Sequence, residues 1–321
     1  MNPVLSDARF EAAVEARAAR GAARHRRGLM LLMLIATFCW ATNIIAGKEA
    51  LRGFGALALA QMRVSGTSAI YFVLFLAWPR QPFLRRPARD WAFLGLVALF
   101  GVTLNQFFFI GGLARTSAAH TALIVALGPV MVLALSCTLG MEALTVLKSI
   151  GILVAFCGVA ILTTGKGRGG NGAHWQGDLL AFAASAVFAY FTILMKKVAV
   201  QCDALTLNTI VFTLGGVLML PFTAPELLRV RWSAVPSLAW WSLAYMIILG
   251  SVLAYLFFTV TLAELSPSRV AAFNYLQPLI AISLGVWMLG EKVTSDLIAG
   301  GALILAGLYL TERENSAEAI E

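Results

Sequence analysis

Ten long apolar stretches follow one another along the chain, each separated from the next by a short polar segment. A helix needs about 20 mostly apolar residues to cross the hydrocarbon core of a bilayer, and the stretches have that length. They are continuous, whereas the strands of a membrane β-barrel alternate between apolar and polar residues. The pattern therefore predicts an all-α integral membrane protein with ten transmembrane helices, over residues 29–50, 56–78, 90–113, 117–138, 144–164, 176–198, 203–222, 238–262, 267–288 and 293–312.

The second half of this pattern repeats the first. When the chain is aligned with itself at an offset of 149 residues, without a gap, residues of the same type coincide. Matched pairs include Gly101 with Gly250, Pro129 with Pro278, and Glu142 with Glu291. Each copy holds five spans, and because five is odd the second copy must enter the membrane from the opposite side. The sequence thus predicts two inverted five-helix repeats, an architecture typical of secondary transporters.

The repeat also divides the chain into segments. We expect a basic tail over residues 1–28, a first repeat over 29–164, a linker over 165–175, a second repeat over 176–312 and an acidic tail over 313–321. The Gly-rich stretch of the linker lacks the Gly-x4-Gly-Lys-Ser/Thr spacing that cradles a phosphate, so it is interpreted as a connection.

Composition agrees with a bilayer as the surrounding solvent. Hydrophobic residues make up 60% of the chain, charged residues make up 12%, and the mean hydropathy is +0.84, which one soluble domain of 321 residues cannot hide in a core. Most Lys and Arg residues lie in the N-terminal tail and in the loops that share its side, which predicts cytoplasmic termini and a bacterial inner-membrane protein. The net charge of +8 is attributed to these loops and to anionic lipid, and no nucleic-acid partner is expected because no basic stretch is interleaved with aromatic residues.

Motifs for covalent chemistry are missing from the sequence. The four cysteines form no Cys-x-x-Cys pair and the three histidines are scattered, so neither a metal nor another cofactor is expected. No His-Glu-x-x-His, Gly-x-Ser-x-Gly or paired carboxylates occur at membrane depth. We therefore expect a protein that is not an enzyme.

Two prolines mark candidate breaks in the spans. Pro129 and Pro278 are related by the repeat and fall near the middle of the fourth and ninth spans. Each removes one helical hydrogen bond and frees the carbonyl four residues earlier, those of Val125 and Asn274. At mid-bilayer a freed carbonyl is tolerated only against protein or a wet cavity, so the breaks indicate a cavity; a kink that only fits the bundle is the alternative.

Amides accompany these breaks. Asn274 and Gln277 lie three residues apart on one face of the ninth span, and their role is either to join helices or to orient a polar substrate. In the first span Trp40, Asn43 and Gly47 share a face, which is typical of a pocket wall.

A few further polar residues lie within spans. Arg63 lies about two turns into the second span and is predicted to bind a substrate carboxylate or to form a gate pair with Glu49. Asn105 and Gln106 are adjacent and about 100° apart around the helix, so we expect at most one to point squarely inward. No carboxylate occupies the middle of a span, and His120 is the one candidate that titrates near neutrality, although a lone histidine is commonly structural.

Several of these segments together resemble the drug/metabolite transporter superfamily, and within it the EamA-type ten-helix exporters. The resemblance covers about residues 30–311. It rests on Phe38-Cys-Trp-Ala-Thr-Asn43 followed by Lys48, on Arg63, on Asn105-Gln106, on Trp175-Gln-Gly-Asp178 and on Leu289-Gly-Glu291. One departure is Met141 before Glu142, where the second copy has Gly290. The resemblance implies a central cavity between the inverted copies that opens alternately to either side, and export of amino acids, related metabolites or lipophilic cations.

The resulting hypothesis is a secondary transporter that exports amino acids or related small metabolites by alternating access. Its partners are a small-molecule substrate and the lipid bilayer, and the sequence leaves monomer and homodimer open. Two alternatives remain: efflux of lipophilic cations, which calls for a buried acid that the spans lack, and a non-transporting sensor or assembly subunit. The predicted substrate-binding residues are Trp40, Asn43, Arg63, Asn105, Gln106, His120, Tyr190, Asn274, Tyr275 and Gln277.

Overall fold

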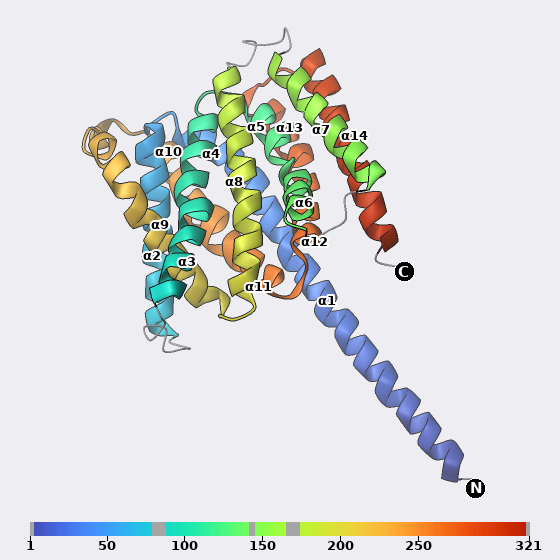
Figure 1. Cartoon of the computed structure of the whole chain (residues 1–321). Coiled ribbons are helices and arrows are strands. Elements are labelled where there is room, and N and C mark those ends of the chain that lie inside the picture. The colour runs from blue at the N-terminus through green and yellow to red at the C-terminus, as the bar shows by residue number, and fades with distance from the viewer. Residues whose placement is uncertain (1–2, 79–87, 141–144, 165–173, 319–321) are drawn as a thin grey trace.

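The computed structural model describes the backbone of residues 3–78, 88–140, 145–164 and 174–318, and side chains for most of residues 24–310 in these ranges. The described residues form a bundle of helices without strands (Figure 1). Glu142 and the Gly-rich part of the linker lie outside them.

The first half contains five spans, two of which are interrupted. The third is built from α3, a π-helical turn and α4, and the fourth from two short helices, α5 and α6. The bounds are α1 Pro3–Ala50, α2 Ala56–Ala77, α3 Ala88–Ala98, η2 Leu99–Leu104, α4 Asn105–Leu113, α5 Ala118–Val125, α6 Gly128–Thr138 and α7 Val146–Thr164.

The second half repeats this order, with the same two spans interrupted. Its bounds are α8 Trp175–Ala199, α9 Ala204–Leu227, η3 Trp232–Ala234, α10 Ser237–Ile247, η4 Ile248–Leu253, α11 Ala254–Glu264, α12 Pro267–Ala272, η5 Phe273–Tyr275, α13 Leu276–Leu289 and α14 Ser295–Glu318.

The predicted spans match this architecture. Nine helices of the described part are long and apolar enough to cross a bilayer, and Ser295–Leu310 adds a shorter apolar helix. The all-α ten-helix fold is therefore confirmed. The seventh span ends later than predicted, because α9 continues to Leu227 through Pro221 and Pro225. Each proline removes one backbone N–H donor, and α9 continues past both of them.

The repeat is visible in the irregular elements. The π-helical turns η2 and η4 are offset by the same 149 residues as the sequence repeat, and so are the starts of α5 and α12. Ser117 and Ser266, another repeated pair, cap these two short helices by accepting a hydrogen bond from the backbone N–H three residues later. A side-chain oxygen at this position satisfies an N–H that the helix itself leaves open.

The two copies run in opposite directions. The Lys48 ammonium at the C-terminal end of α1 donates to the carbonyl of Thr116, and the Thr116 hydroxyl donates to Asp178 in the first turn of α8. The end of α1 therefore lies beside the start of α8, and these equivalent helices are antiparallel (Figure 1). We call this end of the bundle the linker face. The opposite end, where His25 meets Glu264, is the tail face.

Helices of one copy pack mainly against helices of the other. α7 pairs with α14, α2 with α9, α1 with α10, α11 and α13, and α8 with α4, α5 and α6. At the α7–α14 contact a Cβ on Gly158 would lie 2.6 Å from the carbonyl oxygen of Gly300, and a Cβ on Gly307 would lie 2.5 Å from that of Gly151. The small residues Gly300 and Gly307 of α14 are thus used for close packing inside the chain.

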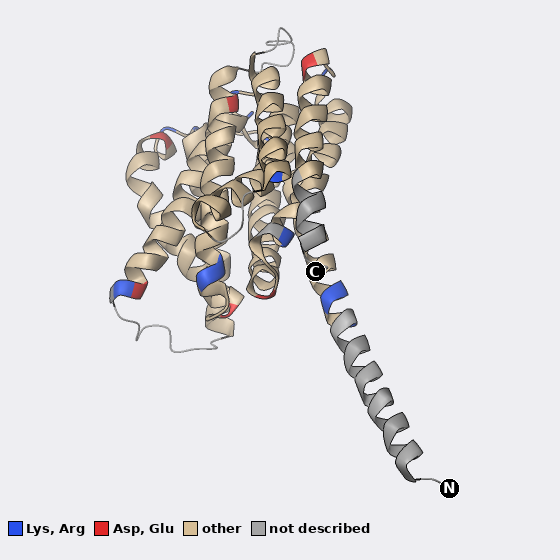
Figure 2. Ribbon diagram, turned by 45° about the vertical axis from the view of Figure 1, so that its right-hand side comes forward, with Lys and Arg blue, Asp and Glu red and all other residues tan. Residues whose placement is uncertain are grey.

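Charged residues lie mainly at the two ends of this bundle and leave a largely uncharged band between them (Figure 2). Large apolar side chains of several helices are exposed, for example Val73, Trp241 and Trp287. Such a surface is stable in contact with lipid tails, and the chain is therefore a multi-pass membrane protein.

Candidate substrate cavity

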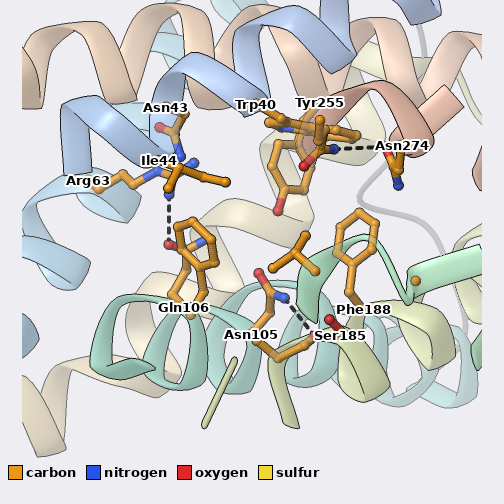
Figure 3. A pocket seen from close by; sticks show the side chains of 15 residues that line it. Trp40, Asn43, Ile44, Arg63, Asn105, Gln106, Ser185, Phe188, Tyr255 and Asn274 are labelled. Carbon is orange, nitrogen blue, oxygen red and sulfur yellow. Dashed lines mark hydrogen bonds between the residues drawn. The ribbon is translucent and has the colours of Figure 1, made fainter. Parts of the chain in front are cut away.

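A cavity of about 70 Å³ lies between the two repeats. This is room for several water molecules, since one needs about 10–15 Å³ on the same measure. Both repeats contribute to its walls (Figure 3). The lining residues are Trp40, Asn43, Ile44, Arg63, Asn105, Gln106, Phe109, Val125, Gly128, Ala184, Ser185, Phe188, Tyr255, Asn274 and Gln277.

Arg63 is the charged residue of this cavity. Its side chain projects from α2 and is almost fully buried, at 2% exposure. Its Nε donates to the Ser251 hydroxyl at 2.8 Å, and its two terminal nitrogens donate to the Gln106 side-chain oxygen and the Gly250 carbonyl, each at 3.2 Å. All three acceptors are neutral. A guanidinium has five N–H groups, so two remain without a partner among the described residues.

The π-helical turn η4 supplies the backbone that Arg63 binds. A π turn departs from the usual i to i−4 bonding and exposes carbonyls to other donors. The Gly250 carbonyl accepts from the Trp40 indole at 3.2 Å as well as from Arg63, and the Val252 carbonyl accepts from the Tyr71 hydroxyl at 2.7 Å. One short turn of the second repeat therefore fixes side chains of α1 and α2.

Asn43 packs directly on this turn. A Cβ on Gly250 would clash with the Asn43 side-chain oxygen and would lie 2.8 Å from its Cγ, so glycine is required for the contact. The Asn43 oxygen is buried without a hydrogen-bond partner in the described part of the chain. An unpaired buried acceptor costs free energy, about 1–3 kcal/mol, and one beside a cavity is ready to accept from a ligand.

The interrupted fourth and ninth spans form another wall of the cavity. α5 ends at Val125 and α6 begins at Gly128 with Pro129 in its first turn, while Pro278 lies in the first turn of α13 after the 3-10 turn η5. Asn274 and Gln277 face the cavity and bind each other, with the Gln277 nitrogen donating at 2.9 Å. At the break in the first copy, the Ile124 carbonyl of α5 accepts from the Ser185 hydroxyl of α8 at 3.0 Å, which satisfies one group at the break.

Asn105 and Gln106 both line the cavity, which differs from the expectation that at most one would point inward. Asn105 donates to the Ala184 carbonyl of α8 at 3.2 Å, while Gln106 faces Arg63 of α2 (Figure 3). Because α4 contacts both α2 and α8, two of its side chains about 100° apart reach different helices.

Aromatic rings form the rest of the wall. Trp40 lies at centroid distances of 5.8 Å from Phe188 and 5.6 Å from Tyr255, both edge to face. Phe258 continues the cluster at 5.6 Å from Trp40. Such edge-to-face pairs are favourable beyond their buried area, which makes this wall rigid and apolar.

The structure brings most of the predicted site residues together. Seven of the ten line the cavity: Trp40, Asn43, Arg63, Asn105, Gln106, Asn274 and Gln277. Tyr190 instead lies edge to face against Phe100, with a ring-centroid distance of 4.7 Å, and Tyr275 packs in the apolar cluster around α5, α7 and α14. His120 bonds Asp178 at the linker face.

Arg63 and Glu49, the other predicted arrangement, do not pair. Glu49 binds Arg52, one turn further along the chain, at 3.0 Å. Among the described residues no group of three or more His, Cys, Asp or Glu side chains is arranged to hold a metal ion.

Several lining residues were not predicted, although the repeat contains a signal for some of them. Tyr255 is the repeat partner of Gln106, Val125 of Asn274, and Gly128 of Gln277, and all six line the cavity. Mapping each polar candidate onto the other copy would have found them. Gly250, Ser251 and Phe188 carry no such signal, because their roles depend on contacts between helices.

The EamA-like transporter family matches this chain twice, over residues 27–164 and 175–313. A protein of Bacillus subtilis called uncharacterized transporter YvbV is 28% identical over 297 residues, covering 91% of this chain and 93% of its own. A probable terminal-alkyne amino-acid exporter of Streptantibioticus cattleyicolor is 26% identical (88% and 92% covered), as is a probable amino-acid metabolite efflux pump of Salmonella typhimurium (87% and 93%).

A solved crystal structure of a protein with 18% identity has the same fold. It superimposes with a TM-score of 0.63 and covers 88% of this chain and 97% of its own. The two matched segments correspond to the two five-span halves, and both halves contribute residues that line the cavity. The chain therefore belongs to the EamA-like transporter family.

Proposed function

We propose that this protein is a secondary transporter that exports amino acids or related small metabolites across the bacterial inner membrane by alternating access. The observation that carries the proposal is the buried Arg63 guanidinium, which has only neutral acceptors in the described part of the chain.

A buried cation without an acidic partner is costly at membrane depth, about 2.5–3.5 kcal/mol on insertion scales. Three neutral acceptors offset part of that cost. A substrate carboxylate would supply the missing opposite charge and could accept from the two remaining N–H groups of Arg63. The substrate class that fits best therefore carries an anionic group.

The other walls suit the rest of an amino acid. The unpaired Asn43 oxygen and the Asn274–Gln277 pair offer acceptors to an ammonium group. The aromatic wall around Trp40 offers an apolar surface to a side chain. Two relatives whose names refer to amino acids or amino-acid metabolites, the exporter and the efflux pump, support this class.

Efflux of lipophilic cations fits less well. Such a substrate would meet the positive charge of Arg63 at close range, and no carboxylate of the described residues lines the cavity to offset the repulsion. Non-transporting sensing predicts saturable binding without flux, which a transport assay separates from the proposal.

The decisive experiment compares three compounds in liposomes that contain the purified protein. Leucine carries a carboxylate, leucinamide has the same side chain without that group, and tetraphenylphosphonium is a lipophilic cation. We expect flux of leucine, or of other amino acids in a metabolite pool read by mass spectrometry, and little flux of the other two compounds.

Variants at position 63 provide the matched test. Arg63→Met keeps much of the volume and removes the charge, and we expect it to lower carboxylate transport at least about tenfold, whereas Arg63→Lys keeps the charge and loses less. Equal flux of leucine and leucinamide, or full activity of Arg63→Met, would show that the carboxylate assignment is wrong.

A further inference from the structure

A buried histidine–carboxylate pair joins α5 to α8 outside the substrate cavity. The Nδ1 of His120 lies 3.2 Å from each carboxylate oxygen of Asp178, and the Thr116 hydroxyl donates to the same carboxylate at 2.5 Å. The Asp178 side chain is 2% exposed and that of His120 is 10% exposed. No described residue bonds the second ring nitrogen of His120.

The pair and the cavity share one helix seam. Val125 and Ser185 line the cavity from α5 and α8, and both helices continue from there toward the linker face. At a rise of about 1.5 Å per residue, His120 lies about 8 Å and Asp178 about 10 Å further along their helices. The pair is therefore separate from the substrate position but belongs to helices that form its walls.

Other charged groups surround the pair. From α1, the Lys48 ammonium binds the Thr116 carbonyl; from the end of α13, the Glu291 carboxylate accepts from the backbone N–H groups of Ala118 and Ala119. Arg115 precedes Thr116 and binds the Gly111 carbonyl, and His174 precedes α8. Lys48 and Glu291 thus bring one basic and one acidic side chain to the residues that flank the His120–Asp178 pair.

The other side of α5 faces an apolar plug. Ala118 and Ala122 pack with Ile44, Leu113 and Ala281 in one cluster. Ile44 also lines the substrate cavity. Two side chains packed on this cluster, those of Leu51 and Leu289, line a wider pocket of about 590 Å³ that also contains Lys48 and Glu291. The plug thus separates the cavity from the linker-face pocket, and α5 lies between the plug and α8.

From this arrangement we propose that the His120–Asp178 pair is the binding site of a coupling proton, exchanged for the substrate during transport. The proton enters from water at the linker face and binds the free ring nitrogen of His120. It leaves from the same nitrogen to water in the cavity when the cavity is open to the tail face. This proposal rests on the proposed transport function.

The physical basis is the charge of the pair. With a neutral imidazole the pair carries a net charge of −1, and with an added proton it becomes an imidazolium–carboxylate pair with no net charge. Burial favours the neutral pair, so uptake of the proton holds α5 against α8, and loss of the proton weakens that contact. Histidine is the side chain that gains and loses charge in the range of physiological pH.

The residues at the repeat-related positions cannot form a second histidine–carboxylate pair. The position of His120 is occupied by Arg269 in the second copy, and that of Asp178 by Leu29 in the first. The proton-dependent contact therefore lies at one face of an otherwise repeated frame, and the gradients of proton and substrate set the direction of the exchange.

Proteoliposomes test the proposal, with 13C-labelled amino acids as the probe and the membrane voltage clamped by potassium and valinomycin. With the lumen about one pH unit more acidic than the outside, one-for-one exchange should accumulate label in the lumen up to about tenfold. His120→Gln and Asp178→Asn should abolish this accumulation while still exchanging labelled for unlabelled amino acid without a pH gradient.

His25→Gln is the matched control, because His25 also binds a carboxylate, that of Glu264, but in an exposed pair at the tail face. It should accumulate label as the natural chain does. The proposed proton site is wrong if the natural chain exchanges amino acids but the pH gradient causes no accumulation of label. It is also wrong if the pH gradient still causes accumulation with His120→Gln. If the natural chain does not exchange amino acids at all, it is the proposed function that fails.

A second measurement uses only the natural protein, so its result does not depend on whether the variants fold. Addition of amino acids to the purified natural protein in weakly buffered detergent, near about pH 6.5, should release up to one proton per molecule, read with a pH dye. Absence of release between about pH 6 and about pH 8 would overturn the proposal.

Discussion

At the scale of single residues, one glycine of η4 positions three side chains of the cavity. The Gly250 carbonyl accepts hydrogen bonds from Trp40 and Arg63, and the absence of a side chain at Gly250 leaves the space that Asn43 fills. Polar side chains such as Arg63 and Asn43 could be selected from the sequence because polar groups within apolar runs are conspicuous. The role of Gly250 could not, because a glycine within a span has no local signal of what approaches it.

We expect Gly250→Ala to impair transport and to destabilise the protein by about 1–3 kcal/mol, because the added methyl overlaps the Asn43 side chain. Thermal unfolding in detergent and the leucine flux assay measure the two effects. Gly95→Ala, where a Cβ would meet nothing within 4 Å, is the control and should leave both unchanged. Normal flux in Gly250→Ala would show that the Asn43 contact is dispensable.

At the scale of elements, irregular turns rather than regular helices position the site. The π turn η4 exposes the carbonyls that bind Arg63 and Trp40, and the breaks at Pro129 and Pro278 place Val125 and Asn274 on the cavity. The sequence indicates the proline breaks, since proline removes a known hydrogen bond. It gives no comparable indication of the π turns, which depend on how neighbouring helices pack.

The contact between α7 and α14 gives a prediction at the element scale. Gly307→Val should destabilise the protein by at least about 1–3 kcal/mol, because a Cβ there lies 2.5 Å from the Gly151 carbonyl oxygen and 2.6 Å from the Ala155 nitrogen. The midpoint of thermal unfolding measures the change. Gly28→Val, at a glycine with open space around it, should shift the midpoint far less; equal shifts would contradict close packing between these helices.

At the scale of the whole molecule, the inverted repeat builds a nearly symmetric frame whose two halves carry different chemistry. Gln106 and Tyr255 occupy equivalent positions in the cavity, and Arg63 has Phe212 as its partner in the second copy. Under the proposed transport mechanism, we expect this frame to provide two related conformations and the unequal side chains to give a substrate a defined orientation.

Membrane orientation is a prediction of this scale. The charge distribution places both termini in the cytoplasm and, because each repeat has five spans, the linker on the other side. Alkaline phosphatase inserted within residues 165–173 should be active in cells, while the same enzyme fused after residue 321 should be inactive. Activity at both positions would contradict the inverted topology, and the reverse result would contradict the predicted orientation.

The sequence by itself determined the ten spans, the repeat, the proline breaks and most polar residues of the cavity. Bilayer thickness, helical hydrogen bonding and the cost of a buried polar group act on each segment separately, so they can be evaluated along the chain. The tertiary structure alone decided which of these groups meet: Arg63 binds Gly250 rather than Glu49, and His120 binds Asp178. These pairings join helices far apart in the sequence, and their energies depend on packing that no single segment specifies.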